Sequence, residues 1–178
     1  YHLLLTVLQA NASLHLSSSI IIFYNNLAPA DIYPLSYTTL FDLNKGATLG
    51  QLGKLEESIA ANDLAIKYEP YYAEAYSNKG YVLGKLGKLE ESISAFNLAI
   101  KYKPDYANAY YNKGATLGQL GKLEESIAAN DLAIKYEQYY SEVYSNKGYV
   151  LGKLGKLEES ISAFNLAIKY KPDYVNAY

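Results

Sequence analysis

Pairs of adjacent glutamates are the reactive groups that recur most regularly in this sequence. The pairs are Glu56-Glu57, Glu90-Glu91, Glu124-Glu125 and Glu158-Glu159. Two neighbouring carboxyl groups can share general acid and base work. Each pair, however, stands at the start of an apolar pattern with helical spacing, where negative charge stabilises the N-terminal end of the helix dipole. We therefore interpret the pairs as solvated helix charges rather than as catalytic dyads.

Other catalytic, metal and cofactor chemistry lacks the residues that it needs. The chain has no Cys, and its two histidines, His2 and His15, both lie near the N-terminus. The serines of the later sequence therefore have no neighbouring His base in the chain order, and zinc would have only two imidazoles. No Gly pattern follows a predicted strand, as a phosphate-binding loop would. We predict no catalytic, metal-binding or cofactor-binding residues, and a protein that is not an enzyme.

The composition argues against a strongly charged partner. The 178 residues include 16 basic residues against 18 Asp and Glu, and the formal net charge is −2. This balance gives no long-range attraction to nucleic acid or acidic lipid, so we expect neither a nucleic-acid nor a membrane partner. Arg, Met, Trp and Cys are absent, while Lys, Asn, Ile and Tyr are abundant. This bias favours an AT-rich bacterial source, and the missing initiator Met favours a fragment.

One tripeptide, Asn-Lys-Gly, recurs at a constant interval along the chain. It begins at Asn44, Asn78, Asn112 and Asn146. Each period contains two apolar patterns with helical spacing. In the second repeat we predict one helix, helix A, over 73–86 and another, helix B, over 88–102, since Leu89, Ile93 and Phe96 recur at helical steps. A fixed period of about 34 residues that contains two helices predicts a helical solenoid, whose repeats pack only on their neighbours.

Residues that end helices separate these patterns. Gly87 can take the positive φ that a tight reversal after helix A requires. Lys101 lies near the end of helix B, where positive charge suits the helix dipole. Pro104 cannot continue helix B, and we predict that the Asp105 side chain caps the next helix A. The predicted order is helix, tight turn, helix and short loop.

These residues resemble the tetratricopeptide repeat family. Its signature positions are filled in the second repeat by Tyr76, Gly80, Leu83, Gly87, Phe96, Ala99 and Pro104, and in the fourth by Tyr144, Gly148, Leu151, Gly155, Phe164, Ala167 and Pro172. The resemblance implies an all-α fold, a right-handed helical solenoid of stacked antiparallel helix pairs. It covers residues 39–178, with repeats at 39–72, 73–106, 107–140 and 141–174 and the start of a fifth at 175–178.

The first and third repeats depart from the family pattern. Asn62 and Asn130 stand where the other two repeats have Phe96 and Phe164. An Asn at this position either turns to solvent or, when buried without a partner, lowers stability. We therefore expect the first and third repeats to be looser than the second and fourth.

The chain also has a longer period, which spans two repeats. Residues 44–110 match residues 112–178 except at four positions. The pairs that differ are Pro70/Gln138, Ala73/Ser141, Ala75/Val143 and Ala107/Val175. Such near-identity indicates a recent duplication, so features shared by the two halves were copied together and are not independent signs of function.

The resemblance implies that function lies on the concave surface, which in this family is lined by A helices and holds an extended peptide or a partner's helix. The residues that match this lining are Asn44, Asn78, Asn112, Asn146, Tyr81, Tyr149, Tyr111, Lys85 and Lys153. Asn side chains can bond the main chain of a ligand, Tyr side chains add contact area, and lysines favour an acidic residue.

Two alternatives concern residues near this surface. Tyr81 and Tyr149 could instead pack between neighbouring helices. Gly84 and its counterparts in the other repeats could admit the close approach of either a neighbouring helix or a ligand.

A subclass of the family clamps the C-terminal carboxylate of chaperone peptides with Lys, Asn and Arg residues. This chain has no Arg, and Ser77, Ala115 and Ser145 occupy positions where such polar or basic groups would be needed. We do not expect binding of that type.

Residues 1–38 differ from the repeats, because no charged residue precedes Asp31. Apolar clusters before Ala28-Pro29-Ala30 resemble a secretory signal with its cleavage site, but a basic start is missing and the apolar run is too short to span a membrane. We interpret this segment as a degenerate repeat. A cytoplasmic protein is expected, with a secreted one as the alternative.

We predict a non-catalytic scaffold that binds a protein or peptide, with an acidic partner favoured. One alternative is a targeting array within a larger enzyme, such as a glycosyltransferase with similar repeats. Another is a self-assembling array, because Ile161, Phe164 and Ile168 of the fourth repeat would be partly exposed and could stack end to end on another chain.

Overall fold

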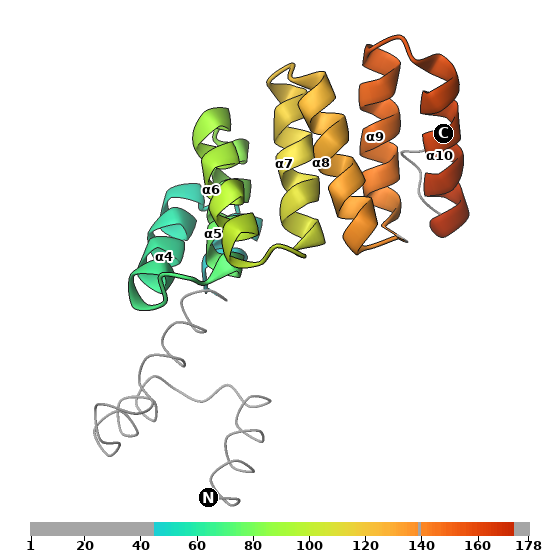
Figure 1. Cartoon of the computed structure of the whole chain (residues 1–178). Helices are drawn as coiled ribbons and strands as arrows, with labels where there is room; N and C mark the ends of the chain where they lie inside the picture. The colour runs from blue at the N-terminus through green and yellow to red at the C-terminus, as the bar shows by residue number, and fades with distance from the viewer. Residues whose placement is uncertain (1–44, 139, 173–178) are drawn as a thin grey trace, which may run out of the picture. The chain divides into compact units, whose positions relative to one another are not determined.

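The computed structural model describes residues 45–138 and 140–172, and all regular structure in these residues is helical. Residues 45–51 are helical, and seven complete helices follow (Figure 1). Their bounds are α4 Leu55–Tyr68, α5 Ala73–Lys85, α6 Leu89–Tyr102, α7 Ala107–Gln119, α8 Leu123–Tyr136, α9 Ser141–Lys153 and α10 Leu157–Tyr170. The predicted all-α fold and the predicted helices of the second repeat are confirmed.

A tight reversal joins the two helices of each repeat. In the second repeat Gly87 has φ 75°, and Lys88 N–H donates to the Leu83 carbonyl at 3.0 Å. This is the left-handed C-terminal cap that the sequence predicts, because only Gly takes such a φ without a steric penalty. Each repeat therefore becomes an antiparallel helix pair.

The predicted side-chain cap at Asp105 is wrong. Tyr106 is the residue that precedes α7, and no side chain caps this helix end. Instead, Ala107 N–H donates to the main-chain carbonyl of Asp105 at 2.9 Å, and Ala109 N–H donates to that of Tyr106 at 3.0 Å. Because turn carbonyls already satisfy these amide groups, a side-chain acceptor is not needed.

A buried serine fastens the two helices of every repeat. The Ser hydroxyl of helix B donates to a Gly carbonyl of helix A at 2.7 Å each time. The pairs are Ser58 with Gly46, Ser92 with Gly80, Ser126 with Gly114 and Ser160 with Gly148. The sequence pattern did not reveal this bond, although the constant spacing of each Ser from its Gly was visible.

The same glycines make room for a large side chain. A Cβ atom built on Gly80 would lie 2.9 Å from the Phe96 ring, and one on Gly114 would lie 3.0 Å from Asn130 Oδ1. Asn130 and Asn62 therefore fill the position that Phe96 occupies in the second repeat. Both asparagines are fully buried, so the prediction that they could turn to solvent is wrong.

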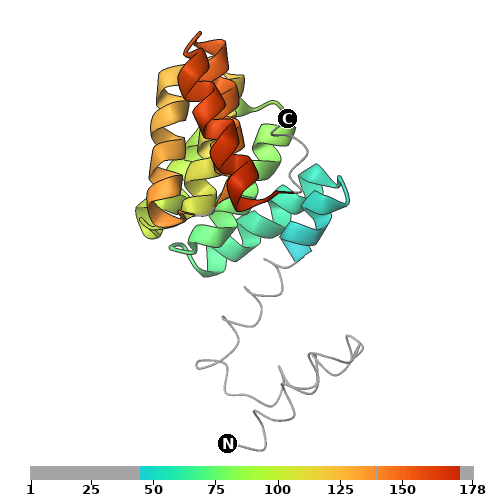
Figure 2. The same cartoon turned by 90° about the vertical axis from the view of Figure 1, so that its right-hand side faces the viewer.

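Neighbouring repeats pack through helix B of one and helix A of the next. Phe96 and Ala99 of α6 pack with Ala109 of α7, and partly buried Tyr76 and Ile100 surround them. Gly84, inside α5, approaches Ser92 and Thr116 side chains, so its close neighbours are helices, as one of the two interpretations holds. Figure 2 shows the stack with α10 in front.

Neighbouring A helices also contact each other directly, α5 with α7 and α7 with α9, whereas successive B helices α4, α6, α8 and α10 make little contact. The closer approach of the A helices places them on the inner side of the stack. No described helix is long and apolar enough to cross a membrane. The predicted degenerate repeat at 1–38, Asn44 and the start of a fifth repeat at 175–178 lie outside the described residues.

Candidate binding surface on the A helices

Two exposed Lys–Tyr pairs stand on the A helices of the second and fourth repeats. The Lys85 ammonium lies 4.7 Å from the centre of the Tyr81 ring, and that of Lys153 lies 4.6 Å from the Tyr149 ring. Tyr81 is 45% exposed and Tyr149 is 56% exposed. These tyrosines therefore do not pack between helices, which was the alternative interpretation. Each presents an aromatic face and a cation to solvent together.

The predicted asparagine ladder is not a row of equivalent groups. Asn146 donates its side-chain amide to Asn130 Oδ1 at 3.1 Å, and Asn112 donates to Asn108 Oδ1 at 2.6 Å. The side chain of Asn78 makes no hydrogen bond with any described residue, and Asn78 is half-buried. Of the three described members, Asn78 therefore has its full hydrogen-bonding capacity available for a ligand.

Tyr111 packs between two repeats rather than facing solvent. Its ring centre lies 5.2 Å from that of Tyr140, and Asn108 Nδ2 donates to the Tyr140 hydroxyl at 3.4 Å. Burial raises the pKa of Tyr140 to about 12, with a smaller contribution from Tyr111. Tyr111 thus joins the third repeat to the fourth and is only partly exposed.

Tyr106 stands one repeat before Tyr140, at the matching position, and was not among the predicted site residues. It accepts a hydrogen bond from the Ser77 hydroxyl or donates one to it, and burial raises its pKa. The available signal was that Tyr106 and Tyr140 are separated by one repeat period. The predicted lining did not include Tyr106 and Tyr140, which precede α7 and α9.

Ion pairs neutralise both carboxylates of helices α5, α7 and α9. Lys103 Nζ lies 2.9 Å from Glu74, and Lys171 Nζ lies 2.9 Å from Glu142. The Lys171 hydrogen bond is the largest cause that holds the pKa of Glu142 below its usual value. The inner helices therefore present no unpaired negative charge in the part of the chain that the structure describes.

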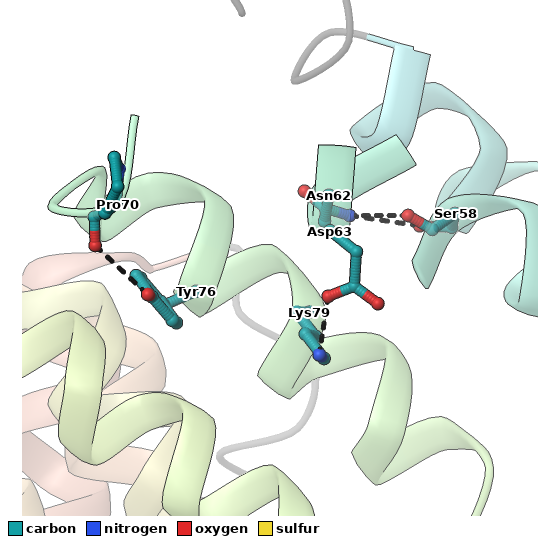
Figure 3. Close-up of polar contacts among 6 residues, drawn as sticks. All are labelled: Ser58, Asn62, Asp63, Pro70, Tyr76 and Lys79. Carbon is teal, nitrogen blue, oxygen red and sulfur yellow. Dashed lines mark hydrogen bonds and ion pairs between the residues drawn. The ribbon is translucent and has the colours of Figure 1, made fainter. Parts of the chain in front are cut away.

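Lysines on the same helices are only partly neutralised. Lys79 pairs with Asp63 at 2.6 Å, as Figure 3 shows, and Lys147 pairs with Asp131 at 2.6 Å. The corresponding partner of Lys113 is Asn97, which carries no charge. Lys113 is half-buried, and desolvation lowers its pKa. Sequence reasoning did not identify Lys113 as a lysine without an ion pair, because that requires knowing that Asn97 is its neighbour on the preceding helix.

Three lysines of α5, α7 and α9 thus have no carboxylate within ion-pair distance among the described residues. They are Lys85, Lys113 and Lys153. All unpaired charge on these helices is positive. A surface of this kind attracts carboxylates through Coulomb forces that water and salt weaken but do not abolish.

A second feature is a hollow of about 450 Å³ where the first and second repeats join. Its lining includes the rings of Tyr68, Tyr71 and Tyr102. No group of three or more potential metal ligands occurs in the described residues. The side chains of Glu74 and Lys103 in the lining of the hollow are paired with each other at 2.9 Å.

Comparison with family models matches two descriptions. The model "TPR repeat" matches residues 80–121, and "Tetratricopeptide repeat" matches residues 107–140 and 141–174. Together the matches run from residue 80 to residue 174, which is more than half of the chain. No curated protein matches the sequence.

Solved structures share this fold. MamA from Desulfovibrio magneticus RS-1 has a TM-score of 0.71 at 19% identity, over 80% of this chain and 81% of MamA. PilF from Pseudomonas aeruginosa has a TM-score of 0.76 at 17% identity, over 80% of this chain and 65% of PilF.

The first repeat domain of RPAP3, solved with the HSP90 peptide SRMEEVD, has a TM-score of 0.65 at 25% identity, over 67% of this chain and 95% of that domain. The repeat period, the helix pairs, the turn glycines and the matched family models agree with one another. The chain belongs to the tetratricopeptide repeat family.

Proposed function

We propose that this chain is a non-catalytic scaffold that binds an extended, acidic segment of a partner protein on helices α5, α7 and α9. The observation that carries the proposal is the charge balance of these helices: both of their carboxylates are in ion pairs, while Lys85, Lys113 and Lys153 are not. A carboxylate of the partner is the natural counterion for these lysines.

Each class of side chain has a role in this proposal. Lys85 and Lys153 attract carboxylates, and the rings of Tyr81 and Tyr149 beneath them provide apolar contact area. Asn78 binds the main chain of the segment, since its amide is both donor and acceptor. The partner's acidic side chains, rather than a single sequence, would then decide binding.

Recognition of a C-terminal carboxylate is not part of the proposal. RPAP3 was solved with a peptide that ends in Glu-Glu-Val-Asp. The present chain has no Arg, and Ser77, Ala115 and Ser145 stand where a carboxylate clamp needs larger polar or basic groups. We therefore expect SRMEEVD with an amidated C-terminus to bind as well as the free peptide does.

The binding experiment uses the full chain and the blocked peptide acetyl-SAEEAS-amide, with acetyl-SAQQAS-amide as its uncharged analogue. The double variant Lys85→Gln/Lys153→Gln should bind the acidic peptide about five-fold more weakly at low salt, because each exposed ion pair contributes about 0.2–1 kcal/mol. Gln is a safe replacement, since Gln119 already stands at the matching position of the third repeat.

A matched control is the double variant Lys101→Gln/Lys169→Gln. These lysines also lie over tyrosine rings, at 5.6 and 5.7 Å, and are also two repeats apart, but they belong to the B helices α6 and α10. Their replacement should leave the affinity unchanged. Equal weakening by both double variants would refute binding on the A helices, and equal binding of both peptides to the unaltered chain would refute the preference for an acidic segment.

A second candidate function is end-to-end association through the outer face of α10. Leu157 is 65% exposed and Ile161 is 60% exposed, whereas Leu89 and Ile93 at the matching positions of α6 are half-buried under α7. No described helix covers this face of α10. Sedimentation velocity over a range of concentrations should show association that Ile161→Glu abolishes; a monomer at every concentration would remove this candidate.

A further inference from the structure

The A helices of the second and fourth repeats differ in sequence only at Ala73/Ser141 and Ala75/Val143, and their Lys–Tyr pairs have nearly the same geometry. Their Lys–Tyr distances are 4.7 and 4.6 Å. The flanking ion pairs agree as well: Lys103 with Glu74 and Lys171 with Glu142 are both at 2.9 Å. These contacts around Lys85 are therefore reproduced around Lys153, although α7 follows α5 in the stack and no described A helix follows α9.

The third repeat, which lies between them, lacks this arrangement. Ala115 and Gln119 stand where Tyr81 and Lys85 stand in the second repeat. Tyr111 is packed against Tyr140 and is half-buried. No Lys–Tyr pair therefore stands between the other two, and Lys113 is the one charged side chain of α7.

We infer that the chain carries two equivalent subsites for acidic peptide, subsite 1 at Asn78, Tyr81 and Lys85 and subsite 2 at Asn146, Tyr149 and Lys153, and that its partner presents two acidic motifs joined by a spacer. This inference rests on the proposed function. The two subsites were copied together when the two-repeat unit was duplicated. Their similarity therefore rests on the geometry of the side chains and not on independent selection.

One difference between the subsites allows their affinities for the same peptide to differ. Asn146 donates an N–H to Asn130, whereas Asn78 has no such bond in the described residues. A ligand at subsite 2 must either leave that bond in place or break it. One neutral hydrogen bond corresponds to roughly a ten-fold change in affinity or less, so the two dissociation constants should agree within about ten-fold.

A partner with two motifs gains affinity from linkage. Once the first motif is bound, the second binds from a high effective concentration that depends on the spacer length. The gain is greatest when the spacer just spans the two subsites and disappears when it is too short. Two separate single-motif ligands would gain nothing.

The test is an NMR titration of the isotope-labelled full chain with acetyl-SAEEAS-amide. Resonances of both subsites should shift and saturate. Lys85→Gln should weaken binding at subsite 1 and leave subsite 2 unchanged, and Lys153→Gln should do the reverse. Saturation at one subsite alone would overturn the inference while the proposed function stands. No binding at either subsite would overturn both.

A second arm uses two SAEEAS motifs joined by Gly-Ser linkers of increasing length. The best linker should raise the affinity at least ten-fold over the single motif, and either single Lys→Gln variant should reduce it to the single-motif value. Tandem peptides that bind no better than the single motif at any linker length would overturn the inference. The variant Lys101→Gln serves as a control that should leave the gain intact.

Discussion

At the scale of single residues, the clearest departure of this chain from its family is the buried Asn in the first and third repeats. Asn62 and Asn130 are both fully buried, and each donates its amide to the main-chain oxygen of a serine one turn earlier, at 2.8 and 2.9 Å. They differ at the carbonyl oxygen. Asn130 Oδ1 accepts from Asn146, whereas Asn62 Oδ1 has no partner and points away from Ser58 (Figure 3).

This difference predicts unequal effects of the same substitution. Asn62→Ala and Asn130→Ala remove the same atoms and the same bond to a serine carbonyl, and Asn62→Ala also removes a long, 3.5 Å contact with the Ser58 hydroxyl. Asn130→Ala also removes the bond to Asn146, so it should lower the free energy of unfolding by about 1 kcal/mol more. Urea denaturation, with hydrogen exchange to locate the affected repeat, measures both losses. A larger loss for Asn62→Ala would mean that its oxygen is bonded in solution.

Tyr140 gives a residue-scale prediction about pH. Its pKa rises from the ordinary 10.0 to about 12 in the folded chain, chiefly because burial disfavours the phenolate. Above pH 10 the unfolded chain loses this proton first, so the stability contributed by neutral Tyr140 is complete below pH 10 and is lost as the pH rises toward 12. Tyr140→Phe should flatten the fall in stability between these values. An unchanged slope would contradict the burial of this hydroxyl.

Residue types alone gave part of the candidate surface. Lys85, Lys153, Tyr81 and Tyr149 could be chosen because their positions matched the family's lining. The pairing state of each lysine could not be read in this way, since Lys113 has no ion pair within the described residues and Asn97, one helix back, stands where Asp63 and Asp131 pair with Lys79 and Lys147. The hydrogen bonds of the Asn side chains likewise depend on neighbours in three dimensions.

At the scale of helices and turns, glycine has two opposite functions in each repeat. In the fourth repeat Gly152 lies inside α9, and Gly155 forms the turn before α10 with φ 75°. A Cβ on Gly152 would make one ordinary contact, 3.4 Å from Ser160 Oγ, and one on Gly155 would meet nothing within 4 Å. Packing therefore decides neither substitution, and backbone conformation does.

Two substitutions in one helix pair test this distinction. Gly152→Ala should stabilise the chain by about 0.5–1 kcal/mol, since Ala loses less backbone entropy in a helix. Gly155→Ala should destabilise it by about 1–2 kcal/mol, because Ala would be forced into the left-handed region. Thermal and urea unfolding of both variants give the two signs. Stabilisation by Gly155→Ala would show that the turn does not need positive φ.

The helices themselves were predictable because local signals agree. Apolar spacing, the turn glycine and Pro104 all indicate the same bounds, and α5 and α6 begin and end within one residue of the predicted positions. The Asp105 cap failed because a side-chain acceptor was inferred where main-chain carbonyls already bond the amide groups. Capping requires knowledge of the preceding turn, which residue type does not supply.

At the scale of the whole molecule, the period of one repeat predicts the stack, and the longer period of two repeats predicts how its surface alternates. Repeats that pack only on their neighbours bring A helices together on one side, where side chains from separate repeats form a continuous surface. Both carboxylates of the described A helices form ion pairs with lysines that lie outside these helices, so the lysines without an ion pair are in excess on that side. The net charge of the chain, −2, gave no indication of it.

The central claim is that an acidic segment lies along helices α5, α7 and α9. The most direct measurement is photo-crosslinking of the full chain with acetyl-SAEEAS-amide that carries a benzophenone group, followed by mass spectrometry of the linked peptides. We predict that crosslinks concentrate in these three helices and decrease with Lys85→Gln/Lys153→Gln. Crosslinks concentrated in α4, α6, α8 and α10, or around Tyr71 in the hollow between the first two repeats, would contradict the claim.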